Sequence, residues 1–175
     1  MEHRLPLFIV TGASGAGKTT VMHELRSLCP DFVMLSTDDD NFGSTNLDYQ
    51  DRYNVLLHLA AAAAKSKIGT IICGTVMPWD AQKCDSYQEF SEVCFINLHC
   101  DDETRNRRLR SRADKDTWTD DMLKAHQEFA QWLLANAATA YNPPMPTIDT
   151  TAAPPAEVAK QINAYVREKW NGIPL

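Results

Sequence analysis

Residues 12–20 read GASGAGKTT, and they fit the pattern G-x-x-x-x-G-K-[ST] from Gly12 to Thr19. The glycines allow backbone angles that are closed to other residues, so successive N–H groups can point at one phosphate. Lys18 adds a point charge for the β and γ oxygens, and the hydroxyl of Thr19 can bind Mg²⁺. The pattern predicts a loop that binds a nucleotide phosphate, made of Gly12, Ala13, Ser14, Gly15, Ala16, Gly17, Lys18, Thr19 and Thr20.

The segments on either side of this loop support the prediction. Residues 5–10, LPLFIV, form a short apolar run with β-branched residues, which is typical of a buried strand. Residues 21–28, VMHELRSL, have helical spacing, and the positive end of that helix would face the same phosphate. A glycine-rich turn with an incidental lysine is the alternative, and the strand and helix argue against it.

Three consecutive aspartates follow a second apolar run at 31–37. In an open parallel sheet, ligands bind beyond the carboxyl ends of the strands, and this run ends there. Asp38 and Asp40 share a side of an extended chain, so they are better candidates than Asp39. One would hold Mg²⁺ with Thr19, and the other would accept the proton of a substrate hydroxyl. Which aspartate has which role stays open, and three solvated turn carboxylates are the alternative.

A third group of candidates is the arginine-rich segment 105–112. On a helix, Arg105, Arg108 and Arg112 would share one face. Guanidinium groups stabilise the charge of a phosphoryl group in transfer, so Arg108 and Arg112 are candidate catalytic residues. The polar link at 113–118, ADKDTW, suits a lid that excludes water. An exposed basic helix with salt bridges to its neighbours is the alternative.

Candidate contacts for a second substrate lie at the end of the third apolar run, 69–75, and in the segments beside it. Gly74 at the end of that run would let a ligand approach the backbone. Trp79 would stack on a planar substrate or cover the core, and the two readings weigh evenly. Arg52 is the candidate cation for an acidic group, with a salt bridge to Asp48 as the alternative. We also expect residues 147–155, TIDTTAAPP, to run along the nucleotide base.

The order of apolar and amphipathic segments predicts the fold class. Strand-like runs lie at 5–10, 31–37, 69–75, 92–100 and 146–149, and helical stretches separate them. This predicts an α/β three-layer doubly wound sandwich with a five-stranded parallel sheet, in one domain over 1–175 with a short helical lid near 105–120. We expect helices over 46–67, 80–90, 118–134 and 155–170. The third should begin at Thr119 and bury Met122, Ala125, Phe129, Trp132 and Leu133.

Composition narrows the classes of partner. The net charge of −6 and pI near 5.3 argue against a nucleic-acid or anionic-membrane binder. The five cysteines include no C-x-x-C pair, so reduced core thiols are expected in place of disulfides or zinc. The first apolar run is too short for a signal segment or a membrane span. We expect a cytoplasmic protein, a monomer or homodimer, whose partner is a small-molecule acceptor.

These features together resemble the small P-loop kinases, namely the nucleoside monophosphate kinase and shikimate kinase group. The resemblance implies ATP, Mg²⁺ and transfer of the γ-phosphoryl group to a small acceptor. It implies that Asp38 or Asp40 binds the acceptor hydroxyl, that Arg52 binds an acidic acceptor, and that Arg112, with Arg108, serves the lid. The third run ends Cys-Gly-Thr, whereas shikimate kinases usually show Gly-Gly-Gly. The acceptor therefore stays open among nucleoside-like, shikimate-like and sugar-acid-like metabolites.

The sequence also bears on three other classes of nucleotide-binding protein. A GTPase switch would need an [NT]-K-x-D run, which the sequence lacks. A motor-like or AAA-type ATPase would need an apolar strand ending in Asp-Glu, and the third run ends otherwise. A nucleotide-binding regulatory ATPase without transfer to a small molecule remains the alternative function.

Overall fold

Five parallel strands form one sheet in the computed structural model, which describes residues 4–38, 42 and 46–171. The strands are β1 Leu7–Thr11, β2 Phe32–Ser36, β3 Gly69–Cys73, β4 Val93–His99 and β5 Thr147–Asp149. Their order across the sheet is β2-β3-β1-β4-β5, and every neighbouring pair is parallel. This arrangement confirms the predicted fold class. The prediction succeeds because a parallel sheet that is covered on both faces needs strands with uninterrupted apolar runs.

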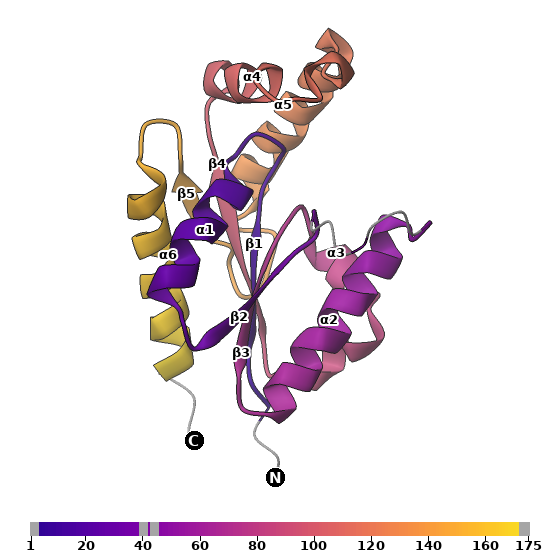
Figure 1. Ribbon diagram of the computed structural model, residues 1–175, viewed down its shortest axis with the longest axis vertical. Helices are drawn as coiled ribbons and strands as arrows, with labels where there is room; N and C mark the ends of the chain where they lie inside the picture. Colours follow the sequence, from indigo (N-terminus) through magenta and orange to yellow (C-terminus); the bar gives the residue numbers. More distant parts are fainter. Residues whose placement is uncertain (1–3, 39–41, 43–45, 172–175) are drawn as a thin grey trace.

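Helices cover both faces of the sheet (Figure 1). Helices α1 Lys18–Leu28 and α6 Pro155–Asn171 pack on one face, over a core that includes Phe8, Val10 and Ile96. Helix α2 Tyr49–Lys65 and helix α5 Asp120–Asn136 pack on the other, over Leu7, Ile9 and Ile72. Alternate residues of β1 thus serve opposite cores, as the pleat requires.

Helix α2 is shorter at both ends than the predicted helix over 46–67. It begins at Tyr49, where the Asp48 carboxylate accepts a hydrogen bond from the N–H of Asp51 and caps the helix. It ends through Lys67, whose φ is +61°, and the N–H of Ile68 donates to the carbonyl of Ala63. Gly69 directly follows this turn and is the first residue of β3.

The helix expected over 80–90 is wrong. The segment forms a short helix α3, Pro78–Ala81, and a 3₁₀ helix η2, Asp85–Glu89. Asn54 of α2 explains the break, because its side chain accepts a hydrogen bond from the N–H of Asp85 and donates to the Asp85 carboxylate. Contacts with another helix therefore override the local propensity.

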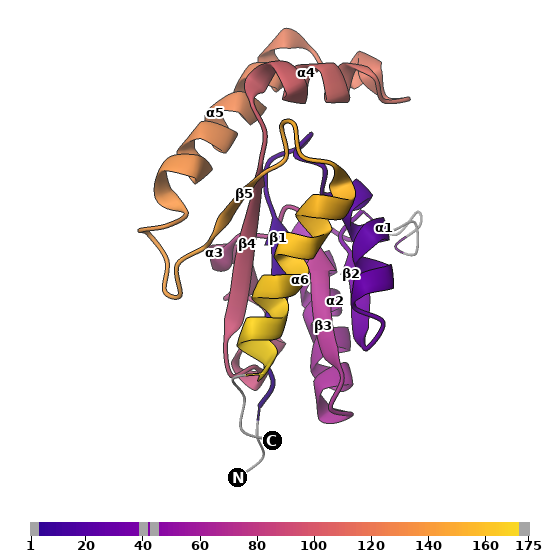
Figure 2. The ribbon, with the colours of Figure 1, turned by 90° about the vertical axis from the view of Figure 1, so that its left-hand side faces the viewer.

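The remaining helices lie above the carboxyl ends of the strands. Helix α4 Asp102–Arg110 crosses over the sheet, and the 3₁₀ helix η3 Lys115–Thr117 links it to α5 (Figure 2). Thr119 caps α5 as predicted, since its hydroxyl accepts from the N–H of Met122. The predicted buried face of α5 is only partly confirmed: Leu133 is buried and Phe129 packs against the core. Met122, Ala125 and Trp132 are exposed, and Leu123 and Ala130 are buried in their place.

The structure bears on the predicted state of the cysteines and on membrane-spanning helices. All five cysteines are free and buried, as predicted. Within the described residues, no helix is long and apolar enough to cross a membrane.

Candidate active site

The loop between β1 and α1 has the backbone of a phosphate cradle. Gly12 has a φ of +139°, and a Cβ at this position would lie 2.3 Å from the carbonyl oxygen of Leu98. Gly17, directly before α1, has a φ of +95°. Both positions therefore need glycine: Gly12 because the backbone of Leu98 lies against it, and Gly17 because its φ lies in the left-handed region.

Lys18 folds back over this loop. Its Nζ donates hydrogen bonds to the carbonyl oxygens of Gly12, at 2.7 Å, and Ala13, at 3.1 Å. Burial, together with the charges of Arg112 and Arg105, lowers the pKa of Lys18 to about 8, and the charge of Asp38 acts in the opposite direction. The ammonium is thus held at the loop, within electrostatic reach of an aspartate and two arginines.

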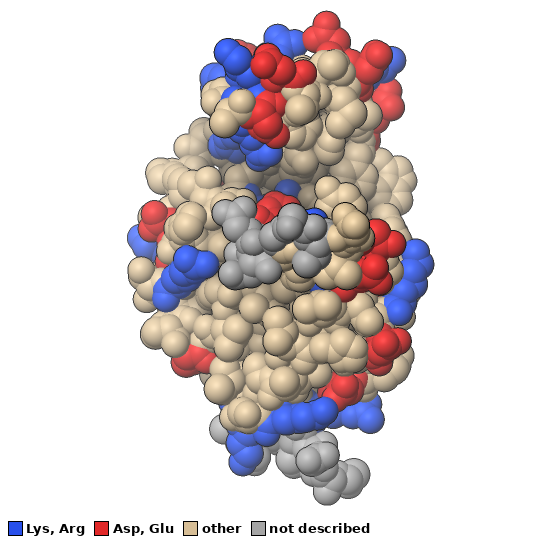
Figure 3. All heavy atoms as spheres, turned by 45° about the vertical axis from the view of Figure 1, so that its right-hand side comes forward, with Lys and Arg blue, Asp and Glu red and all other residues tan. Residues whose placement is uncertain are grey.

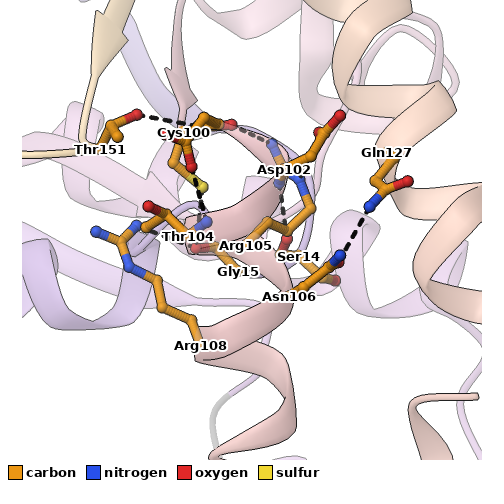
Figure 4. Close-up of polar contacts among 11 residues, drawn as sticks. Ser14, Gly15, Cys100, Asp102, Thr104, Arg105, Asn106, Arg108, Gln127 and Thr151 are labelled. Carbon is orange, nitrogen blue, oxygen red and sulfur yellow. Dashed lines mark hydrogen bonds and ion pairs between the residues drawn. The ribbon is translucent and has the colours of Figure 1, made fainter. Parts of the chain in front are cut away.

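Arg105 supports the loop from behind (Figure 4). Its guanidinium donates from Nη1 to the carbonyl of Ser14, at 2.9 Å, and from Nη2 to the carbonyl of Cys100, at 2.8 Å. The side chain is fully buried, and Asp102 lies 3.9 Å from Nε. The residue is a structural brace, since it joins the carbonyl of the phosphate loop to the carbonyl that follows β4.

Arg108 connects α4 to both the phosphate loop and the segment after β5. It donates to the carbonyl of Gly15 and to the hydroxyl and carbonyl of Thr150, at 2.7–3.2 Å. The Thr150 hydroxyl in turn donates to the carbonyl of Ala16 at 2.8 Å. Sequence reasoning named the segment 147–155 but did not single out Thr150, whose only signal was its place directly after a strand.

A cavity of about 310 Å³ opens beside these residues. Its lining includes Gly15, Gly17, Arg108, Arg112, Thr150 and Pro155. The cavity joins the phosphate loop to the segment 147–155, so it offers room for the rest of a nucleotide next to its phosphates.

Arg112 lies beyond the end of α4, so it does not share a helix face with Arg105 and Arg108 as expected. Its guanidinium lies over the ring of Trp118, 5.7 Å from the centroid, and Trp118 meets His126 edge-on at 5.2 Å. Burial lowers the pKa of His126, and the charges of Arg105, Lys18 and Arg112 lower it further. Sequence reasoning missed His126, because five scattered histidines gave no pattern.

The predicted acceptor contacts lie around the ends of β2 and β3. Asp38 is exposed and accepts a hydrogen bond from the Thr37 hydroxyl at 3.2 Å, whereas Asp40 lies outside the described residues. Arg52 forms no ion pair with any described residue, including Asp48; its guanidinium lies over the rings of Phe42 and Tyr49.

The structure shows the protein surroundings of Gly74 and Trp79. A Cβ at Gly74 would lie 2.1 Å from the hydroxyl of Thr37, so the residue that follows β2 already requires a glycine here. Trp79 does not cover the core; it is 42% exposed and meets Trp132 edge-on at 5.8 Å.

The residues present fit a nucleotide with Mg²⁺. The exposed Thr19 follows Lys18 in the first turn of α1, and the Asp38 carboxylate acts electrostatically on that lysine. No cluster of three or more His, Cys, Asp and Glu side chains occurs in the described part of the chain. A P-loop needs none, since phosphate oxygens and water complete the coordination of Mg²⁺.

The comparisons with known proteins agree with this geometry. A family model described as an AAA domain matches residues 7–134. The chain belongs to this family. The sequence argued against a motor-like or AAA-type ATPase, because the third apolar run does not end in Asp-Glu. In the structure β3 is followed by Gly74 and Thr75, and membership of the family does not by itself assign a motor activity. Comparison with curated protein sequences finds no match.

Solved structures share the whole fold at low sequence identity. Shikimate kinase from Acinetobacter baumannii, in complex with shikimate, is 19% identical with a TM-score of 0.62, covering 97% of this chain and 96% of its own. A gluconokinase from Sinorhizobium meliloti is 16% identical at 0.60, covering 97% of both chains. The Deinococcus radiodurans tunicamycin resistance protein is 19% identical at 0.64, covering 98% of both. The predicted resemblance to small P-loop kinases is thus confirmed for the fold.

Proposed function

We propose that this protein transfers the γ-phosphoryl group of ATP to a hydroxyl or phosphate of a small metabolite. The observation that carries the proposal is the phosphate loop, where Lys18 donates to the carbonyls of Gly12 and Ala13 and the adjoining cavity is lined by Arg108 and Arg112. The charge of Asp38 also acts on the Lys18 ammonium. A phosphate-binding lysine, a carboxylate and an arginine are the groups that phosphoryl transfer asks a protein to place together. The full-length likeness to kinases supports the same class.

The aspartate, the lysine and the arginine have separate roles in the proposed reaction. The acceptor oxygen forms a bond to the γ-phosphorus, and the bond from that phosphorus to the β–γ bridging oxygen breaks with its electron pair leaving on ADP. The acceptor proton passes to the aspartate that acts as base, Asp38 or Asp40. Arg112 and Lys18 stabilise the negative charge on the phosphoryl group in transfer. Mg²⁺, held with Thr19, would supply further charge neutralisation to the bound triphosphate.

A regulatory ATPase without small-molecule transfer is the second candidate. It is favoured by the position of Arg112, whose guanidinium lies on Trp118 in the structure. Such a protein would bind ATP with the same loop but would not respond to acceptors.

The test is release of ADP from Mg-ATP across a panel of nucleosides, nucleoside monophosphates, sugar acids and shikimate. Stimulation by one class in the wild type, abolished in Lys18→Ala, is the expected result. Asp38→Asn should then lose turnover while ATP still binds, if Asp38 is the base. ATP binding without stimulation by any acceptor would favour the regulator.

A further inference from the structure

The Thr75 hydroxyl reaches the phosphate loop from beyond the end of β3. It donates a hydrogen bond to the carbonyl oxygen of Gly12 at 3.1 Å. The side chain is half-buried, so it lies at the border between the protein interior and solvent. The neighbouring Gly74 is a candidate contact of the acceptor, but neither the sequence pattern nor the proposed reaction gives Thr75 a role.

The same carbonyl oxygen is an acceptor for Lys18, whose Nζ donates to it at 2.7 Å. A carbonyl oxygen has two lone pairs, so it can accept from the ammonium and from the hydroxyl at once. The Gly12 oxygen thus joins the phosphate-binding cation to Thr75. Two hydrogen bonds, and not an electrostatic effect alone, place Thr75 at the phosphate loop.

The Gly12 peptide needs a contact of this kind. Gly12 has a φ of +139°, and glycine has the widest choice of backbone angles of any residue, so the chain itself does little to fix this peptide. The Gly12 carbonyl and the N–H of Ala13 belong to one planar unit. A bond that fixes the carbonyl therefore also fixes the direction of an N–H in the phosphate loop.

Thr75 is itself fixed by contacts with two other elements. The hydroxyl of Tyr53, a buried residue of α2, donates to the Thr75 carbonyl at 2.8 Å. The N–H of Gly74 donates to the carbonyl of Val10, near the end of β1, at 3.0 Å. The segment after β3 is thus held by α2 and by β1, and it presents the Thr75 hydroxyl from a fixed position.

These contacts lie at the edge of the sheet where a ligand is expected. Strands β1 and β3 are parallel neighbours, so their carboxyl ends meet at one edge, and ligands of open parallel sheets bind at that edge. Figure 3 shows a hollow between the part of the molecule that carries α4 and the body below it, with basic atoms in its depth. A side chain that holds the phosphate loop at this edge bears on ligand binding as well as on the fold.

We propose that Thr75 is a positioning residue for the nucleotide: its hydroxyl fixes the Gly12 carbonyl, and through that carbonyl the ammonium of Lys18, in the place where the triphosphate binds. The inference rests on the proposed kinase function and adds a residue to its site. Without the hydroxyl, the Gly12 peptide can turn and the ammonium loses its fixed place. ATP then binds more weakly, because binding must also order these groups.

The experiment measures Mg-ATP binding by calorimetry in variants of Thr75, each shown to be folded by thermal unfolding. Thr75→Val keeps the shape of the side chain but removes the donor, and we expect a roughly tenfold loss of affinity. Thr75→Ser keeps the hydroxyl and should bind Mg-ATP within about twofold of the wild type. Thr70→Val is the matched control, because Thr70 lies on β3 and its buried hydroxyl has no hydrogen-bond partner in the described part of the chain. Its affinity should not change.

A double-mutant cycle with Lys18→Met separates positioning from a merely structural role. If Thr75 acts through Lys18, the loss caused by Thr75→Val should shrink from about tenfold to about threefold or less when Lys18→Met is already present. A contribution to the fold alone would weaken binding by the same factor in both backgrounds. The titrations are made at low ionic strength, where weak complexes with Mg-ATP are still measured.

The outcomes separate the inference from the function on which it rests. Full Mg-ATP affinity in Thr75→Val, or the same loss with and without Lys18→Met, would overturn the inference and leave the kinase intact. So would a loss in Thr75→Ser as large as that in Thr75→Val. Binding that depends on Thr75 as expected, without transfer to any acceptor, would support the inference and count against the kinase. A wild-type protein that does not bind Mg-ATP would overturn both.

Discussion

The fully buried guanidinium of Arg105 donates a hydrogen bond from Nη1 to the carbonyl oxygen of Ser14, 2.9 Å away. A second bond runs from Nη2 to the carbonyl of Cys100, which follows β4. A side chain of α4 thereby fixes both the phosphate loop and the strand end below it. The shape of the loop depends on a residue far along the sequence.

Removing this brace should destabilise the fold. Arg105→Met leaves two buried carbonyls without their charged partner, and we expect the free energy of unfolding to fall by about 3 kcal/mol. Urea denaturation measures the loss. Arg107→Met is the control, because Arg107 is exposed on the same helix and should change stability by less than about 0.5 kcal/mol. Equal effects of the two substitutions would contradict the assigned role.

Nucleotide binding should take up protons near pH 8. Burial lowers the pKa of Lys18 to about 8, so about half of these lysines are neutral at that pH in the free protein. A bound triphosphate favours the charged ammonium and raises the pKa, so binding at pH 8 takes up protons. ATP affinity should therefore rise as the pH falls through 8, and level off once the free lysine is charged.

Calorimetry in two buffers of different ionisation enthalpy measures this uptake. Lys18→Arg is the control, because a guanidinium stays charged throughout the range. If the wild type and the variant take up the same number of protons at pH 8, the titrating group is not Lys18.

The two glycines of the loop should differ in their tolerance of a methyl group. Gly12→Ala brings a Cβ to 2.3 Å from the Leu98 carbonyl oxygen, whereas at Gly17 the nearest atom is Nη1 of Arg108 at 3.8 Å. Gly17→Ala meets only the strain of its left-handed φ, about 1–2 kcal/mol. Gly12→Ala should lose more stability than this and should weaken ATP binding further. Thermal unfolding and ATP titration of both variants check the order.

Thr150 should contribute to nucleotide affinity through its hydroxyl. Thr150→Val keeps the shape of the side chain but removes the bond to the Ala16 carbonyl and the acceptor for Arg108. We expect ATP to bind roughly five- to tenfold more weakly, measured by calorimetry. Thr150→Ser keeps the hydroxyl and should bind ATP nearly as the wild type does. Full affinity in Thr150→Val, or an equal loss in Thr150→Ser, which keeps the hydroxyl, would contradict this role of the hydroxyl.

The sequence predicts those parts of the structure that depend on neighbours along the chain. The strands follow from uninterrupted apolar runs, and the phosphate loop follows from its glycines and Lys18. The positions of the three arginines do not follow from the sequence, because spacing alone places Arg105, Arg108 and Arg112 on one shared helix face. The end of α4 at Arg110 and the burial of Arg105 beneath the loop separate their positions.

The buried face of α5 shows the same limit. Its apolar residues cover more than one side of the helix, so periodicity cannot decide which side meets the core. The contact of Gln127 with Asn106 of α4 helps to set the rotation of the helix. That rotation turns Trp132 outward and Leu123 inward, which no local pattern encodes.

The bonds of Arg108 to Gly15 and Thr150 also determine where motion can start. Arg105 and Arg108 both fasten α4 to the phosphate loop. We therefore propose that the lid predicted near 105–120 is narrower, pivots at Ser111 or beyond, and consists of the stretch from Arg112 to the start of α5 at Asp120, including Trp118. A cover this small can shield the phosphates, but the rest of a bound acceptor must be shielded by its own contacts with the protein.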